Sequence, residues 1–162
     1  MPVTVTLMSE LWPASSARFA GGWRVMPGPV VVEPATVSAS GLLVAGGWYS
    51  PQGEQLARYR AVVDGSAGVE LERILAEVDA AGYEVGGDQL KTRPRGVDPE
   101  HPRLELLRYR SVTASRSYDP EPWLPTASAL DHVRSGWRAM APLIEWLATS
   151  VGPGADPGER RR

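Results

Sequence analysis

The stretch LDHVRSGWRAMAPLIEWL, residues 130–147, decides the fold because it has the pattern of one long amphipathic helix. Its apolar residues recur every three or four positions over about five turns, which places them along one side of a helix. Thr126 is a candidate N-cap, and Pro142 is expected to kink the helix or to remove one backbone hydrogen bond. The expected buried stripe consists of Leu130, Val133, Trp137, Met140, Ala141, Ile144 and Leu147.

Two shorter helices are expected in the middle of the chain, over residues 51–64 and 66–82. Pro51 suits the first turn of the earlier helix, whose apolar face holds Leu56, Tyr59 and Val63. Ser66 is a candidate cap for the later helix, and Gly82 is expected to end it. The core stripe of the later helix consists of Leu71, Ile74, Leu75 and Val78.

The remaining segments predict β-structure. Residues 30–39 and 42–49 are rich in β-branched and apolar residues, and Ser40-Gly41 between them predicts a hairpin. Gly46-Gly47 inside the second strand indicates a bulge or the close approach of another backbone or of a ligand. Residues 83–94 are interpreted as two short strands joined by a turn at Gly86-Gly87. A short helical turn over 102–107 and a strand over 108–118 follow.

These elements predict a single α+β domain over residues 30–150. An antiparallel sheet would carry the two middle helices and the long C-terminal helix packed on it. Residues 1–29 are interrupted by Pro and Gly and are expected to be irregular. Residues 151–162 form a polar Gly/Pro-rich tail that is expected to be disordered. Most tryptophans are expected to be core or rim aromatics, and His132 to face solvent.

The composition excludes several classes of function. The 162-residue chain has no cysteine, which removes disulfides, thiolate metal sites and cysteine nucleophiles, and its two histidines lack metal-binding spacing. No cofactor is therefore predicted. No apolar run is long enough to span a membrane, and no signal peptide is recognisable, so a cytoplasmic protein is expected. The net charge of −2 argues against nucleic acid as a partner.

Within this acidic chain, cations gather in residues 90–110, LKTRPRGVDPEHPRLELLRYR. If the segments are strands, Lys91, Arg93 and Arg95 point to one face, and Arg108 and Arg110 do the same in theirs. Guanidinium groups bind carboxylate or phosphate oxygens in a bidentate manner. His101 is a further candidate, either as a phosphate donor or as a general base. The candidate ligand-binding set is therefore Lys91, Arg93, Arg95, His101, Arg108 and Arg110.

A simpler interpretation exists for each of these residues. The cations could form a solvated sheet face that is paired with acidic residues of the helices over 54–79, as alternating charge on an exposed strand often does. His101, in a His-Pro pair, could only shape a turn and cap backbone groups. No phosphate-loop, nucleophile-elbow or metal-protease motif is present, so no catalytic residue is assigned.

Three blocks of the chain resemble a known family. They are GGWYSPQGEQLARYRAVVD (46–64), GGDQLKTRPRGVDPEHPRLELLRYRSVTASR (86–116) and WRAMAPLIEWL (137–147). Their order and spacing are similar to those of domain of unknown function 2461, an uncharacterised family found mostly in bacteria, over about residues 37–147. The resemblance implies an α+β domain and no assigned activity. Residues 1–36 do not match the family's N-terminal region, and apolar surface left bare by that difference would allow self-association.

Two functions follow from the basic segment. The first is binding of a small ligand that bears phosphate or carboxylate. The second is a non-catalytic scaffold or interaction protein that presents the same basic face to an acidic partner. A concave arrangement of the cations would favour the first, and a flat face paired with acidic residues would favour the second.

Overall fold

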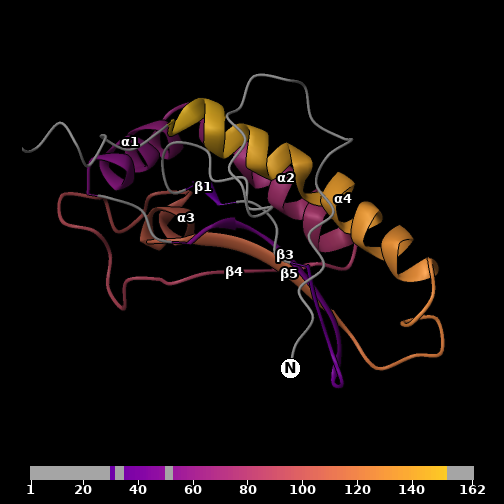
Figure 1. Ribbon diagram of the computed structural model, residues 1–162. Helices are drawn as coiled ribbons and strands as arrows, with labels where there is room; N and C mark the ends of the chain where they lie inside the picture. The colour runs from indigo at the N-terminus through magenta and orange to yellow at the C-terminus, as the bar shows by residue number, and fades with distance from the viewer. Residues whose placement is uncertain (1–29, 32–34, 50–52, 153–162) are drawn as a thin grey trace, which may run out of the picture.

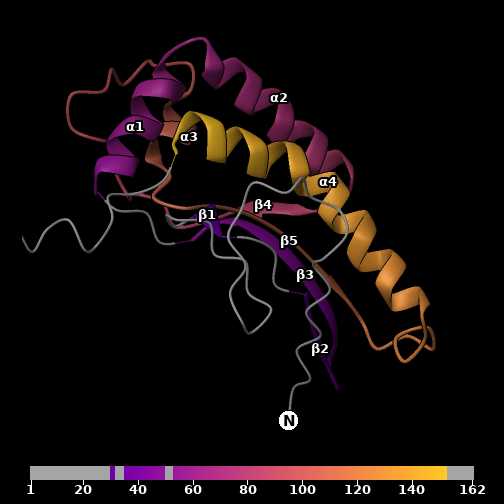
Figure 2. The ribbon, with the colours of Figure 1, turned by 45° about the horizontal axis from the view of Figure 1, so that its top comes forward.

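The computed structural model describes residues 30–31, 35–49 and 53–152, so the expectations for residues 1–29 and most of the 151–162 tail lie outside the described residues. The expected α+β architecture is confirmed. A five-stranded antiparallel sheet is covered on one face by α2 and α4, which lie side by side (Figure 1, Figure 2). The elements are β1 (Val30–Val31), β2 (Ala35–Ser38), β3 (Gly41–Trp48), α1 (Gly53–Asp64), α2 (Ala67–Ala80), β4 (Glu84–Gly86), α3 (Leu104–Arg108), β5 (Val112–Tyr118) and α4 (Ser128–Ser150).

The sheet is organised around β3. Strands β1 and β2 pair with successive stretches of one edge of β3, β5 pairs with the other edge, and β4 pairs with the far side of β5. The expected hairpin joins β2 to β3, with Ser38 paired to Gly41 across a two-residue turn. All strand pairs are antiparallel, as expected.

The Gly46-Gly47 pair is explained by two close approaches. Gly47 has φ +139°, and a Cβ there would lie 2.3 Å from the Val112 carbonyl oxygen, so another backbone does approach closely. A Cβ on Gly46 would lie 3.4 Å from the Met140 sulfur of α4. The two glycines therefore let β5 pair tightly with β3 and let α4 settle onto the sheet.

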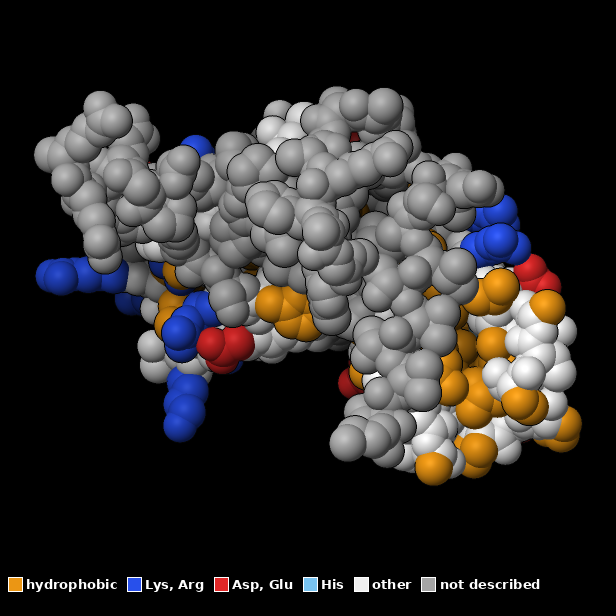
Figure 3. All heavy atoms as spheres, viewed as in Figure 1, with side chains coloured by type: hydrophobic (Ala, Val, Ile, Leu, Met, Phe, Trp, Pro, Cys, Tyr) orange, Lys and Arg blue, Asp and Glu red, His pale blue; other side chains and the backbone are white. Residues whose placement is uncertain are grey.

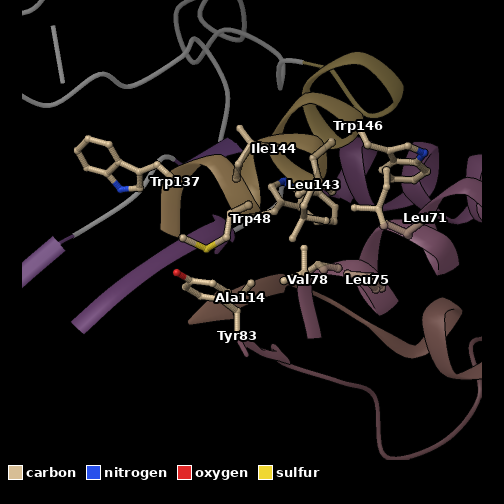
Figure 4. Close-up of a cluster of buried hydrophobic side chains, with 14 of the residues drawn as sticks. Trp48, Leu71, Leu75, Val78, Tyr83, Ala114, Trp137, Leu143, Ile144 and Trp146 are labelled. Carbon is tan, nitrogen blue, oxygen red and sulfur yellow. The ribbon is translucent and has the colours of Figure 1, made fainter. Parts of the chain in front are cut away.

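The core lies between the sheet and the helices (Figure 4). Trp48 of β3 is fully buried beneath α4, and its ring centroid is 5.4 Å from that of Tyr59 in α1. Each large apolar side chain buried in this way stabilises the fold by about 1.5–3 kcal/mol. The expected stripe of α4 is confirmed, although Leu130 and Ala141 are only half-buried. Gly136, Leu143 and Trp146 widen the buried face.

The helix ends agree with the sequence in part. Gly82 has φ +86° and directly follows the C-cap of α2, as expected. Ser66 precedes α2 but makes no side-chain capping hydrogen bond, because its backbone is already in the helical region. Before α4, the Thr126 hydroxyl accepts a hydrogen bond from the backbone N–H of Ser128, 3.2 Å away. The helix continues through Pro142, whose missing N–H removes one backbone hydrogen bond.

Candidate functional site

The sequence predicted that Lys91 and Arg93 lie in the second strand of a hairpin over residues 83–94, and that prediction was wrong. Gly87 has φ +139°, and a Cβ there would lie 2.1 Å from the Ser111 carbonyl oxygen. Instead of turning back, the chain continues along the same edge of the sheet, where Gln89 forms an isolated bridge with Tyr109. Gly87, in a glycine pair that resembles a hairpin turn, thus allows close approach to the neighbouring backbone.

Lys91, Arg93 and Arg95 consequently lie in the loop between β4 and α3 and are exposed. They do not share a sheet face, because the residues here have no regular strand alternation. Pro94 is buried between the two arginines and anchors the loop. Figure 3 shows Lys and Arg side chains standing out at the lower left of the molecule, where this loop and α3 lie.

Arg108 was expected in a strand but is the last residue of α3. Its guanidinium donates to both carboxylate oxygens of Glu105, at 3.0 and 3.2 Å, and to the backbone oxygens of Leu90 and Lys91, at 2.9 and 3.3 Å. These contacts tie the loop to α3. The side chain is thereby engaged in holding the fold.

Arg110 lies between α3 and β5, outside the strand in which it was expected. Its guanidinium forms an ion pair with Asp88 at 3.2 Å, and both side chains are more than half exposed. An exposed pair of this kind contributes about 0–1 kcal/mol to stability. Like Arg108, Arg110 therefore already has a carboxylate neighbour.

His101 and Arg103 bind the loop to the end of α1 through hydrogen bonds. The His101 Nδ1 accepts the backbone N–H of Arg103 at 3.0 Å, so Nε2 is the ring nitrogen left to donate to Asp64, 2.9 Å away. The Arg103 guanidinium donates to the carbonyl oxygens of Val63, Asp64 and Gly65. It thus satisfies the backbone acceptors that the C-terminal end of α1 leaves open.

A hollow of about 460 Å³ lies between α1 and this loop, and Arg60, Arg95 and His101 contribute to its lining. Burial lowers the pKa of Arg60, Tyr59 acts in the opposite direction, and the neighbouring charge of Arg110 lowers it further. The hollow also has two carboxylates, those of Asp64 and Asp98. Both are engaged: Asp64 contacts His101, and Asp98 accepts the backbone N–H of Glu100.

The structure therefore brings together only part of the predicted set. Arg95 and His101 share the hollow, Arg108 and Arg110 are paired with acidic residues, and Lys91 and Arg93 are absent from its lining. Sequence reasoning missed Arg60. Its position in α1 gives no sign of a site, because the segment that completes the hollow comes more than thirty residues later.

A family model described as conserved hypothetical protein (DUF2461) matches residues 35–146. The chain belongs to the DUF2461 family. The match spans β2 to α4, including all three blocks on which the resemblance was based, except for the last residue of the third. Comparison with curated proteins and with solved structures gave no significant match.

Two further findings bear on the DUF2461 fold in this chain. Among the residues that the structure describes, no group of three or more His, Cys, Asp or Glu side chains is placed to hold a metal ion. Within the same residues, no helix has the length and apolar character needed to cross a membrane.

Proposed function

We propose that this DUF2461 protein binds a small ligand bearing phosphate or carboxylate in the hollow between α1 and the loop over residues 94–101. Arg60 and Arg95 would contact the anionic group, and His101 would orient the loop. The proposal keeps the anionic ligand expected from the sequence and moves its site from a sheet face to this hollow.

One observation carries the proposal: Arg60 and Arg95 line the same hollow, and neither has an ion pair with a carboxylate in the described part of the chain. Arg60 makes one long hydrogen bond, from Nε to the Leu107 carbonyl oxygen at 3.4 Å. Its terminal nitrogens are thus available to an anion. A half-buried guanidinium gains more from an anionic partner than an exposed one, because less water screens the pair.

The second candidate is binding of an acidic protein partner through the loop itself. It is favoured by the exposure of Lys91, Arg93 and Arg95, which form no ion pair with any residue that the structure describes. This function would use all three cations to a similar extent. Ligand binding in the hollow would depend on Arg95 far more than on Arg93.

The two candidates are separated by thermal unfolding of the full chain in increasing inorganic phosphate, with citrate as a carboxylate probe. A ligand whose free concentration is one hundred times its dissociation constant adds about 2.7 kcal/mol to the free energy of unfolding. Arg95→Gln should abolish most of the rise in Tm. Arg93→Gln is the matched control, since it removes the same charge on the other side of Pro94. Equal losses in both variants, or no response of the unsubstituted protein to either anion, would contradict the proposal.

A further inference from the structure

A second hollow, of about 390 Å³, is lined by residues of β5 and of the first half of α4. The start of α4 lies at the end of the sheet opposite to α1 and α3 (Figure 1, Figure 2). The floor of the hollow continues the face of β5 that contributes Val112 and Ala114 to the core. Beyond Ala114 the residues on that face become Arg116 and Tyr118. The sheet face thus changes from apolar to cationic and aromatic at the point where the core ends.

Arg116 is held between aromatic rings in this hollow. Its guanidinium carbon lies 4.8 Å from the ring centroid of Tyr118 and 5.8 Å from that of Tyr83, distances at which cation–π attraction operates. Burial and then a hydrogen bond with Tyr118 raise the pKa of Tyr83, which keeps its phenol neutral beside the arginine. The rings therefore fix Arg116 without neutralising it.

The N–H groups at the edge of the Arg116 guanidinium can bind a further hydrogen-bond acceptor. Its one hydrogen bond to the described residues runs from Nη1 to the Ala81 carbonyl oxygen at 3.4 Å, and it has no carboxylate partner among those residues. Asp131 also lines the hollow, but its carboxylate is 3.7 Å from the Arg134 guanidinium. A carboxylate approaching Arg116 edge-on would complete a bidentate pair.

His132 forms an aromatic wall here and does not simply face solvent, which corrects the expectation from the sequence. Its ring stacks on Trp123 with centroids 3.9 Å apart, and it meets Tyr118 at 5.0 Å in a T-shaped contact. On the same side of α4, Ser135 and Ala139 are small and leave the space open. The hollow therefore offers aromatic edges and faces around a single fixed guanidinium.

We propose that this second hollow binds a monocarboxylate with a flat apolar body, the carboxylate pairing with Arg116 and the body packing against Tyr118 and His132. The charged residues that line the hollow are one arginine and one aspartate. The Arg116 guanidinium can match a single negative charge, while the Asp131 carboxylate disfavours a phosphate dianion. The inference is independent of the anion site at the other end of the sheet.

Benzoate is the probe, and calorimetric titration of the full chain is the measurement. Because Arg116 is exposed, its pair with the carboxylate is worth up to about 1 kcal/mol, so Arg116→Gln should weaken benzoate binding roughly fivefold. Ser135→Leu fills the hollow without removing a charge and should weaken binding to a similar extent. Arg138→Gln, an exposed residue of α4 outside the hollow, is the matched control and should leave the affinity unchanged.

Acetate separates the contribution of the head group from that of the flat body, and it should bind more weakly than benzoate. Should Arg116→Gln lower the melting temperature, Ser135→Leu still tests the site, because Arg116 and its ring contacts remain. An undetectable interaction with benzoate would overturn the proposal. So would equal affinities in Arg116→Gln, Ser135→Leu and Arg138→Gln.

Discussion

The two hollows at the ends of the sheet are built in different ways. The hollow beside α1 is closed by a loop that side-chain hydrogen bonds hold in place, chiefly from Arg103, His101 and Arg108. The hollow beneath α4 is built on a strand and a helix, and stacked aromatic rings set its geometry. One hollow therefore depends on polar contacts between residues distant in sequence, while the other is part of the packed framework.

The two hollows should therefore respond differently to substitutions. Changes in the loop should disturb the first hollow and leave the second intact. The effect should be local because the loop's side-chain hydrogen bonds and its ion pair end on α1, on α3 and on Arg110 before β5, and none of these contacts involves the start of α4.

The largest loss of stability is expected at Gly87, where the chain enters the loop. Gly87→Ala combines a disfavoured positive φ with a Cβ 2.1 Å from the Ser111 carbonyl oxygen. Strain and forced backbone shift together should cost about 3 kcal/mol or more, measured by urea unfolding. Gly96→Ala is the control, since Gly96 also has positive φ but its Cβ would enter open space, and it should cost about 1 kcal/mol. Equal costs would show that the close approach to Ser111 is not limiting.

A smaller loss of stability is expected when the hydrogen bonds from Arg103 to the end of α1 are removed. Arg103→Met keeps the apolar stem but leaves the carbonyl oxygens of Val63 and Asp64 without their donor, at a cost of about 2 kcal/mol in urea unfolding. The phosphate response should weaken, while benzoate binding at the other end stays unchanged. Arg73→Met breaks only an exposed ion pair with Glu77 and should cost about 0.5 kcal/mol or less. A matching fall in benzoate affinity for Arg103→Met would break the separation of the two ends.

The parts of the fold that could be predicted are those whose pattern is local. The stripe of α4 follows from helical spacing, and the β2–β3 hairpin follows from two apolar runs and a short polar turn. Gly82 was correctly interpreted because a glycine after an apolar stripe usually ends a helix. In each of these cases the residues that decide the structure are neighbours in sequence.

The candidate sites were less predictable, because partners far along the chain decide them. Gly86-Gly87 suits a hairpin turn, yet Ser111 and the bridge between Gln89 and Tyr109 keep the chain extended along the sheet. Arg116 was not among the residues that the sequence singled out. Its contact with Tyr83 depends on the register in which β4 pairs with β5, and no local sequence pattern predicts that register.

The most direct test of the anion site is amide chemical-shift mapping of the full chain with inorganic phosphate, repeated with benzoate. We expect phosphate to shift the amides of Ala61, Gly96 and Val97, which line the hollow beside α1, and to leave those of Tyr118 and Ser135 unmoved. Benzoate should shift the amides of Tyr118 and Ser135. Phosphate shifts confined to Lys91–Arg93, or found equally at both ends of the sheet, would contradict a site built on Arg60 and Arg95.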